Sequence, residues 1–114
     1  MNERTQLVGK FAMVIFTFRD EKGEITGYKQ THGRIKRAND SEGIVIYNED
    51  DQQEFSLPPN YEAMQPAQPG EYTESSTGKV FTDPDIFTLW EVIQIGADKG
   101  GGTEWKHIKI DYPT

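Results

Sequence analysis

The sequence predicts an all-β protein, a small antiparallel β-barrel or rolled sheet of SH3-like or similar form, with six to eight strands and one long proline-rich loop. Three observations predict it. Residues 33–60 hold three short runs of β-branched or aromatic residues separated by two polar turns, which is the pattern of a β-meander. No segment of ten or more residues repeats apolar side chains with the helical spacing i, i+3, i+4. Other runs are apolar on both faces, and closing a sheet removes the exposed edges of such strands.

The first expected strand is the apolar run Phe11–Phe18. Both of its alternating sets of side chains are apolar, which predicts a strand covered on both sides. Residues 19–24 are expected to form a hairpin loop in which Gly23 takes a positive φ.

The second expected strand, Ile25–Ala38, is long and should bend. Gly27 and Gly33 are the positions where a bulge or a corner is expected, because glycine tolerates the backbone angles needed there. Ile35 and Tyr28 are expected to point inward.

The meander itself is predicted at Arg34–Arg37, Ile44–Tyr47 and Glu54–Leu57, with turns at residues 39–43 and 48–51. After it, residues 58–85 form the long irregular loop and contain five of the six prolines. Since a structureless loop of this length is unusual in a compact domain, we expect it to contain local structure. That structure is one helical turn near residues 61–64 and short strands near residues 71–72 and 79–81.

The last two strands are predicted at residues 86–95 and 104–112, joined by a glycine-rich connection. The first of them is apolar enough to pair with a second copy if it lies at an edge, so both a monomer and a homodimer are considered. We expect residues 1–114 to form a single β domain, with residues 1–6 disordered.

Composition excludes several classes of function. The chain has no cysteine, which removes disulfides, thiol nucleophiles and cysteine-bound metals and fits a reducing compartment. Neither a leader sequence nor a membrane-length apolar run is found, so a cytoplasmic protein with no membrane association is expected.

Charge is unevenly distributed along the chain. Residues 1–38 contain eight Lys or Arg and four Asp or Glu, a net charge of +4, whereas residues 39–91 contain one and twelve, a net charge of −11. Residues 92–114 are neutral, which gives −7 for the whole chain. An acidic segment of this kind repels phosphates and attracts a basic protein, although it is equally consistent with a solvated surface kept for solubility.

Partner binding is therefore the first functional hypothesis. Carboxylates give long-range attraction and tyrosines give contact area at a small loss of entropy. The candidate partner-binding residues combine these two types and are Glu49, Asp50, Asp51, Tyr61, Glu62, Glu71, Tyr72 and Glu74. The plainer interpretation of Tyr61 and Tyr72 is that they hold the proline-rich loop against the sheet.

The alternative hypothesis is a small barrel that binds nucleic acid. It would use the basic second strand, whose candidate residues are Tyr28, Lys29, Arg34, Lys36 and Arg37. The acidic balance of the whole chain argues against nucleic acid as the partner. A purely structural role is a further alternative.

Catalysis and metal binding find little support in the sequence. There is no nucleophile elbow, and His32 and His107 lie on separate expected strands, so each is interpreted as a surface or half-buried residue. Residues 48–51 lack the spacing of a calcium loop, and Asp83 and Asp85 flank a proline as turn residues do. We predict no catalytic residue, no metal site and no cofactor, and hence a protein that is not an enzyme.

A set of short motifs suggests a family resemblance. The motifs are His32-Gly33-Arg34-Ile35, Gly43-Ile44-Val45-Ile46, Leu57-Pro58-Pro59, Pro69-Gly70-Glu71-Tyr72, Ser76-Thr77-Gly78-Lys79-Val80 and Asp83-Pro84-Asp85 followed by Trp90. With this order of motifs, residues 32–92 resemble a family of small uncharacterised bacterial all-β proteins. In size and acidity the chain also resembles the immunity proteins of bacterial toxin systems. The first resemblance implies a shared fold, and the second implies a non-enzymatic protein that docks a basic partner; neither assigns a role to a single residue.

Overall fold

Strands make up most of the computed structural model, which describes residues 6–96, 98 and 100–108. In chain order the elements are β1 (Phe11–Arg19), β2 (Ile25–Asn39), β3 (Gly43–Asn48), β4 (Gln53–Leu57), the 3₁₀ turn η1 (Tyr61–Ala63), β5 (Gln65–Pro66), β6 (Glu71–Thr73), β7 (Val80–Thr82), β8 (Ile86–Gln94) and β9 (Thr103–Ile108). The prediction of an all-β protein is confirmed, with nine strands in the described residues instead of six to eight.

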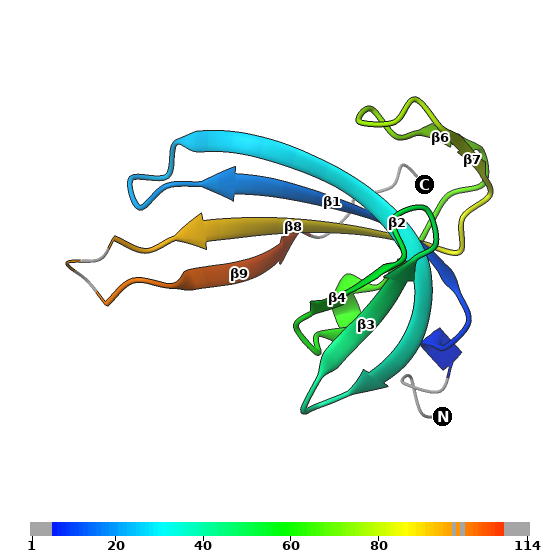
Figure 1. The fold of residues 1–114 in the computed structure, drawn as a ribbon, viewed down its shortest axis with the longest axis horizontal. Coiled ribbons are helices and arrows are strands. Elements are labelled where there is room, and N and C mark those ends of the chain that lie inside the picture. Colours follow the sequence, from blue (N-terminus) through cyan, green and yellow to red (C-terminus); the bar gives the residue numbers. More distant parts are fainter. Residues whose placement is uncertain (1–5, 97, 99, 109–114) are drawn as a thin grey trace.

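Seven of these strands form one sheet and two form a separate hairpin (Figure 1). The order in the large sheet is β4-β3-β2-β1-β8-β5, and β9 pairs with β8 on the same side as β5. β1 and β8 run parallel, so the sheet is mixed, and the predicted antiparallel pairing holds for the other described pairs. Within the described residues the pairing is an open path from β4 to β5 and β9, and closure into a barrel stays a prediction.

The bend of β2 gives the sheet its rolled shape. Figure 1 shows β2 running alongside β1 and then curving away, which carries β3 and β4 over one face of the sheet. Its pairing slips twice, between Ile25 and Gly27 opposite β1, and between Ile35 and Arg37 opposite β3. The expected bulge beside Gly27 is therefore present, whereas the second one follows Gly33 by a few residues.

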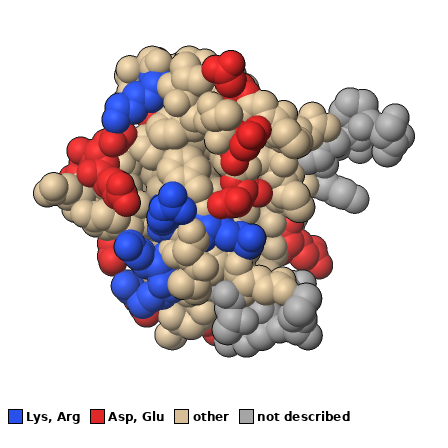
Figure 2. Space-filling model, turned by 90° about the vertical axis from the view of Figure 1, so that its right-hand side faces the viewer, with Lys and Arg blue, Asp and Glu red and all other residues tan. Residues whose placement is uncertain are grey.

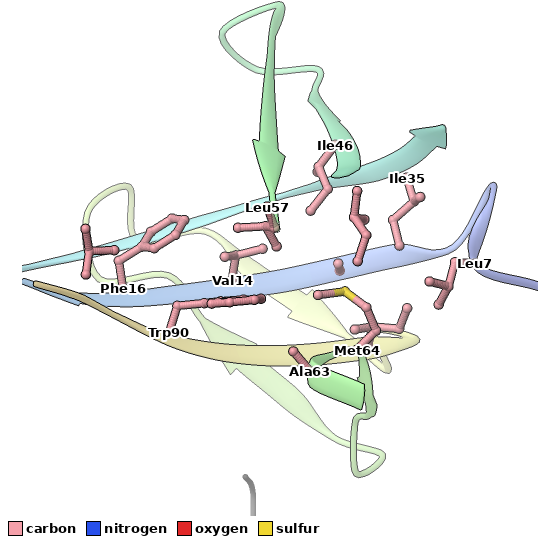
Figure 3. Close-up of a cluster of buried hydrophobic side chains, with 13 residues drawn as sticks. Leu7, Val14, Phe16, Ile35, Ile46, Leu57, Ala63, Met64 and Trp90 are labelled. Atoms are coloured by element: carbon pink, nitrogen blue, oxygen red, sulfur yellow. The ribbon is translucent and has the colours of Figure 1, made fainter. Parts of the chain in front are cut away.

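The core fills the concave side of this roll (Figure 3). Val14 and Phe16 of β1 meet Trp90 of β8, and all three are buried together with Ile35 and Leu57 from the overlying strands. This confirms Ile35 as an inward residue.

Tyr28 was expected to point inward and does not, since it is 69% exposed. It pairs with Thr17, whose side chain lies on the opposite face of β1 from that of Phe16. Side chains alternate along a strand, so a shift of one residue separates the core from solvent.

The irregular segment contains the expected local structure, with η1, β6 and β7 at the predicted places. β8 is not an edge strand, because β1 covers one side of it and β5 and β9 cover the other. β8 therefore cannot pair edge to edge with β8 of a second copy. β9 begins one residue before the predicted start of the last strand, at Thr103. Residues 109–112 of that predicted strand lie outside the described residues.

In the part of the chain that the structure describes, no helix is both long and apolar enough to cross a membrane.

Candidate functional site

A groove of about 610 Å³ lies on the concave side of the roll. Strands β1, β2 and β8 supply its floor, and β4 and β9 supply its two sides. Its lining residues are Phe16, Phe18, Lys29, Thr31, Asp51, Gln53, Glu54, Phe55, Ser56, Val92 and Trp105. The groove therefore lies between the two outer strands of the open sheet.

Aromatic side chains dominate the apolar part of this groove. Phe16 and Phe18 follow each other on one face of β1, with ring centroids 6.1 Å apart, and Trp105 meets the Phe16 ring edge-on at 5.8 Å. Trp105 stays 37% exposed although Trp90 packs against it at 6.0 Å. An aromatic surface left partly open to solvent is what a binding site for an apolar side chain requires.

Charged side chains lie around the aromatic floor. Asp51 and Glu54 line the groove from the β4 side, and Lys29 lines it from β2. One oxygen of Asp51 accepts a hydrogen bond from the Gln53 backbone N–H at 3.0 Å, which fixes the turn. The second oxygen of this carboxylate keeps lone pairs for a cationic ligand.

Glu54 belongs to an exposed cluster with Arg37 and Glu42. The Arg37 guanidinium lies 2.9 Å from Glu42 and 3.1 Å from Glu54. Hydrogen bonds to Glu42 and then Glu54 raise the pKa of Arg37, and the contact with Arg37 together with Asn39 lowers the pKa of Glu42.

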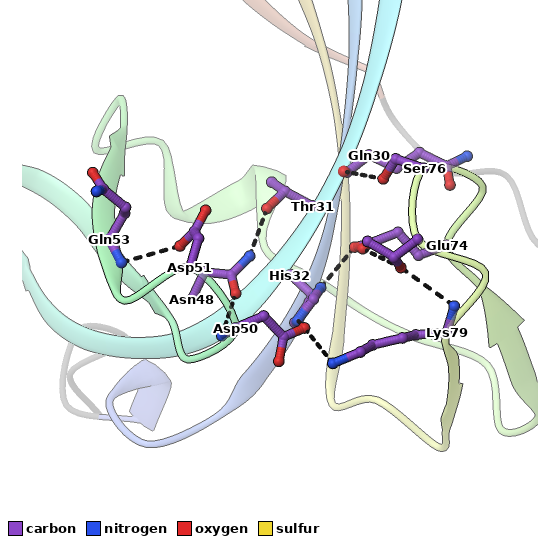
Figure 4. A network of polar contacts seen from close by, with 11 residues as sticks. Gln30, Thr31, His32, Asn48, Asp50, Asp51, Gln53, Glu74, Ser76 and Lys79 are labelled. Carbon is purple, nitrogen blue, oxygen red and sulfur yellow. Dashed lines mark hydrogen bonds and ion pairs between the residues drawn. The ribbon is translucent and has the colours of Figure 1, made fainter.

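Behind the groove, on the other face of β2, a histidine is held between two carboxylates (Figure 4). His32 Nδ1 lies 2.6 Å from Glu74 Oε2, and Nε2 lies 3.0 Å from Asp50 Oδ2. Both His32 and Glu74 are buried, and the Phe81 ring packs against the imidazole in a tilted arrangement, with ring centroids 4.3 Å apart. The expectation of a surface or half-buried residue is wrong for His32 and right for His107.

Lys79 and Thr77 complete this cluster. Lys79 Nζ lies 2.8 Å from Asp50, and Thr77 donates to the other oxygen of Glu74 at 2.8 Å. The hydrogen bond from Lys79 is the main cause that lowers the pKa of Asp50, and His32 adds to it. The cluster joins β2, the β3–β4 turn and the β6–β7 hairpin, so it holds the hairpin against the large sheet.

A cavity of about 160 Å³ lies against His32, lined by Phe11, Arg34, Tyr47, Glu49, Asp50 and Phe81 among others. No serine or cysteine lines it. In the described residues, no three or more His, Cys, Asp or Glu side chains are arranged to hold a metal ion.

The structure separates the residues predicted to bind a partner. Asp51 lines the groove, Glu49 and Asp50 line the cavity at His32, and the carboxylate of Glu74 is enclosed. Glu62 and Glu71 are exposed but line neither hollow.

The two tyrosines of this set follow the plainer interpretation. Tyr61 packs against the hydrophobic core. Tyr72 donates to the Gln68 carbonyl at 2.7 Å and packs on Phe87 at 5.3 Å. Both therefore tie the proline-rich segment to the sheet.

Many acidic side chains of the central segment accept hydrogen bonds from backbone N–H groups or form ion pairs with other residues of the same chain. Asp85 accepts from the Phe11 N–H at 2.9 Å and Asp83 from the Gly70 N–H at 2.7 Å, which confirms them as turn residues. Glu91 pairs with Arg19 at 3.4 Å. Figure 2 accordingly shows acidic and basic side chains in neighbouring patches on one face, so this face is not uniformly acidic.

The predicted basic patch is also divided. Lys29 faces the groove, whereas Tyr28 and Arg34 lie on the other face of β2. Arg34 donates to the Gly9 carbonyl and lies over the Phe11 ring, and Lys36 lies over the Tyr47 ring. With Arg37 bound to two glutamates, these residues do not form a continuous phosphate-binding surface.

The residues that define the groove, namely Phe16, Phe18, Phe55 and Trp105, are not among the predicted site residues. Their apolar character predicts that they lie in strands of the sheet, but it does not reveal which part of a sheet face stays open.

Comparison with known proteins returns no matching family model, curated protein or solved structure. The resemblances suggested by the motifs therefore stay predictions.

Proposed function

We propose that this protein is a non-enzymatic binding protein whose groove receives an extended segment of a basic protein partner, in the manner of an immunity protein. The observation that carries the proposal is a groove of about 610 Å³ whose aromatic floor is bordered by Asp51 and Glu54. The proposal includes a rolled, SH3-like architecture, with the groove on its concave side, and a cytoplasmic location, which the absence of cysteine suits.

The chemistry of the groove favours a protein segment. Partly exposed aromatic residues such as Trp105 are the anchors that dominate binding energy at protein interfaces. The two carboxylates add attraction for Lys or Arg and speed the encounter with a positively charged molecule. Since the net charge of the whole chain is −7, acidic residues outside the groove also attract a basic partner.

A labelled peptide tests the proposal. The probe is an eight-residue peptide that alternates lysine and valine, and its binding is followed by fluorescence anisotropy at low salt. Trp105→Ala should weaken binding at least tenfold, because it removes the central anchor. Tyr28→Ala is the matched control, since it removes an exposed aromatic residue outside the groove. Equal affinities of these two variants would contradict the proposal.

The carboxylates are tested separately. Asp51→Asn keeps an oxygen for the Gln53 N–H but loses the charge, and it should weaken binding about two- to fivefold at low salt, the usual range for an exposed ion pair. Glu62→Gln, an exposed charge outside the groove, should have no effect. Higher salt should reduce the difference.

The same assay distinguishes nucleic acid as the partner. A labelled single-stranded oligonucleotide would stack its bases on the aromatic floor and place phosphates near Lys29. Binding that fails after Lys29→Gln and improves after Asp51→Asn would favour that alternative and count against a basic partner.

A further inference from the structure

We infer that the partner segment binds as an added β-strand along the outer edge of β4, an inference that rests on the proposed function. β4 ends the pairing order of the large sheet, and no described strand pairs with its outer side. Such an edge presents a row of backbone N–H and C=O groups that a further strand can satisfy.

The lining of the groove shows that this edge is accessible. Four consecutive residues of β4, Gln53 to Ser56, line it. Consecutive side chains of a strand point to opposite faces, so side chains of one face alone would supply only every second residue. A continuous run indicates that the groove also runs along the backbone edge.

Residues on the opposite side of the groove also indicate that the groove runs along β4. Trp105 of β9 lines the groove and also a second hollow of about 280 Å³ next to the end of β4, and Ser56 lines both. The two hollows therefore adjoin along β4. Beyond them, Asn60 Nδ2 lies 2.8 Å from His107 Nδ1 and ties the loop after β4 to β9.

The occupant follows from the size and charge of this channel. β4 has five residues, which corresponds to roughly 17 Å of added strand. One face of that strand would meet Phe16, Phe18 and Trp105, and its alternate residues would lie toward solvent and the carboxylates. A segment that alternates apolar and basic residues satisfies both requirements.

N-methylation of the peptide tests the mode of binding. N–H groups of a strand alternate between its two edges, so methylation of every second nitrogen blocks one edge and leaves the other intact. In the lysine–valine peptide, the valines are the side chains that meet the aromatic floor, so the register cannot slip by one residue without exposing them. We expect one set of methylated nitrogens to weaken binding at least tenfold and the other set to be tolerated.

Amide hydrogen exchange of the unmodified protein provides the second measurement. Bound peptide should slow exchange at least tenfold at those amides of β4 that do not pair with β3. Peptide that binds without this protection, and with equal affinity for both methylated forms, would overturn strand addition while leaving the proposed function standing.

Two other outcomes are distinguishable. No binding of any peptide would count against the proposed function itself. Protection of β4 that rises with protein concentration in the absence of peptide would show that a second copy occupies the edge, and it would overturn the inference.

Discussion

His32 illustrates how a single polar residue can be placed inside a small β protein. Each of its ring nitrogens faces a carboxylate oxygen, at 2.6 Å and 3.0 Å. Carboxylates only accept hydrogen bonds, so both contacts are hydrogen bonds when both ring nitrogens carry a proton. The charge of Glu74, which is enclosed by protein, is then compensated by an immediate partner and by the Thr77 hydroxyl.

Removal of the Glu74 charge should therefore destabilise the fold. Glu74→Gln keeps the shape but leaves His32 without its buried anionic partner, and we expect a loss of about 2–4 kcal/mol in the free energy of unfolding. Urea denaturation measures it. Glu71→Gln, three residues away and exposed, is the control and should stay within about 0.5 kcal/mol of the wild type. A Glu74 variant as stable as this control would show that the pair contributes nothing.

Asp50 should show its environment in an acid titration. Lys79 lowers the pKa of Asp50 below its ordinary value of 3.8, so the ionised carboxylate favours the folded state above that pH. This contribution is lost as the pH falls through the lower, folded-state value. In Lys79→Met the Asp50 midpoint, followed by NMR of the carboxyl carbon, should move back up toward 3.8. Lys22→Met, on the β1–β2 loop, should leave it unchanged; identical midpoints in both variants would contradict the assignment.

At the scale of elements, β2 determines the shape of the molecule. It pairs with β1 along one half and with β3 along the other, and it bends between them. At the bend, Gly33 lies so close to β3 that a Cβ there would be 2.4 Å from the Tyr47 carbonyl oxygen. The glycine is required because the two backbones approach each other, since its own φ is ordinary.

Two glycine variants of β2 test this. Gly33→Ala should lower the free energy of unfolding by about 1–3 kcal/mol, because backbone atoms must move to accommodate the methyl group. Gly27→Ala meets nothing within 4 Å and should be neutral or stabilising by up to about 1 kcal/mol. Thermal unfolding of both proteins gives the comparison, and a Gly33 variant as stable as the Gly27 variant would mean that β2 and β3 are not in close contact there.

Local sequence patterns predicted the individual strands and turns well. They predicted poorly which strands pair with each other when the strands are distant in the sequence. The meander, η1 and the β6–β7 hairpin all depend on residues close in sequence, and they were found at the predicted places. The parallel pairing of β1 with β8 joins residues more than 70 positions apart, and no local pattern encodes it. That pairing places β8 inside the sheet. The two apolar faces of β8 therefore reflect an interior strand and not an exposed edge that could pair with a second copy.

At the scale of the whole molecule, folding brings some basic residues of positions 1–38 against acidic residues of the central segment, as in the pairs of Arg19 with Glu91 and of Arg37 with Glu42. Arg37 of the basic β2 binds Glu42 in the β2–β3 turn and Glu54 of β4, while His32 and Lys79 bind Asp50 in the β3–β4 turn. A count along the sequence cannot show such pairing. It selected Asp51, which lines the groove, but also Glu74, which is enclosed.

The groove could not be predicted because it is a property of the roll. Phe16 and Trp105 are adjacent only because β8 brings β1 and β9 together. The sequence shows that each is an aromatic residue in a predicted strand, whereas their place in the groove depends on the open side between β4 and β9.

An NMR titration of the labelled protein with the lysine–valine peptide tests whether this open side is the functional face. We expect the largest amide shifts at Phe16, Phe18 and Phe55, together with a shift of the Trp105 indole signal. Shifts confined to Tyr28 and Arg34 on the opposite face of β2, with the Trp105 indole unmoved, would contradict it.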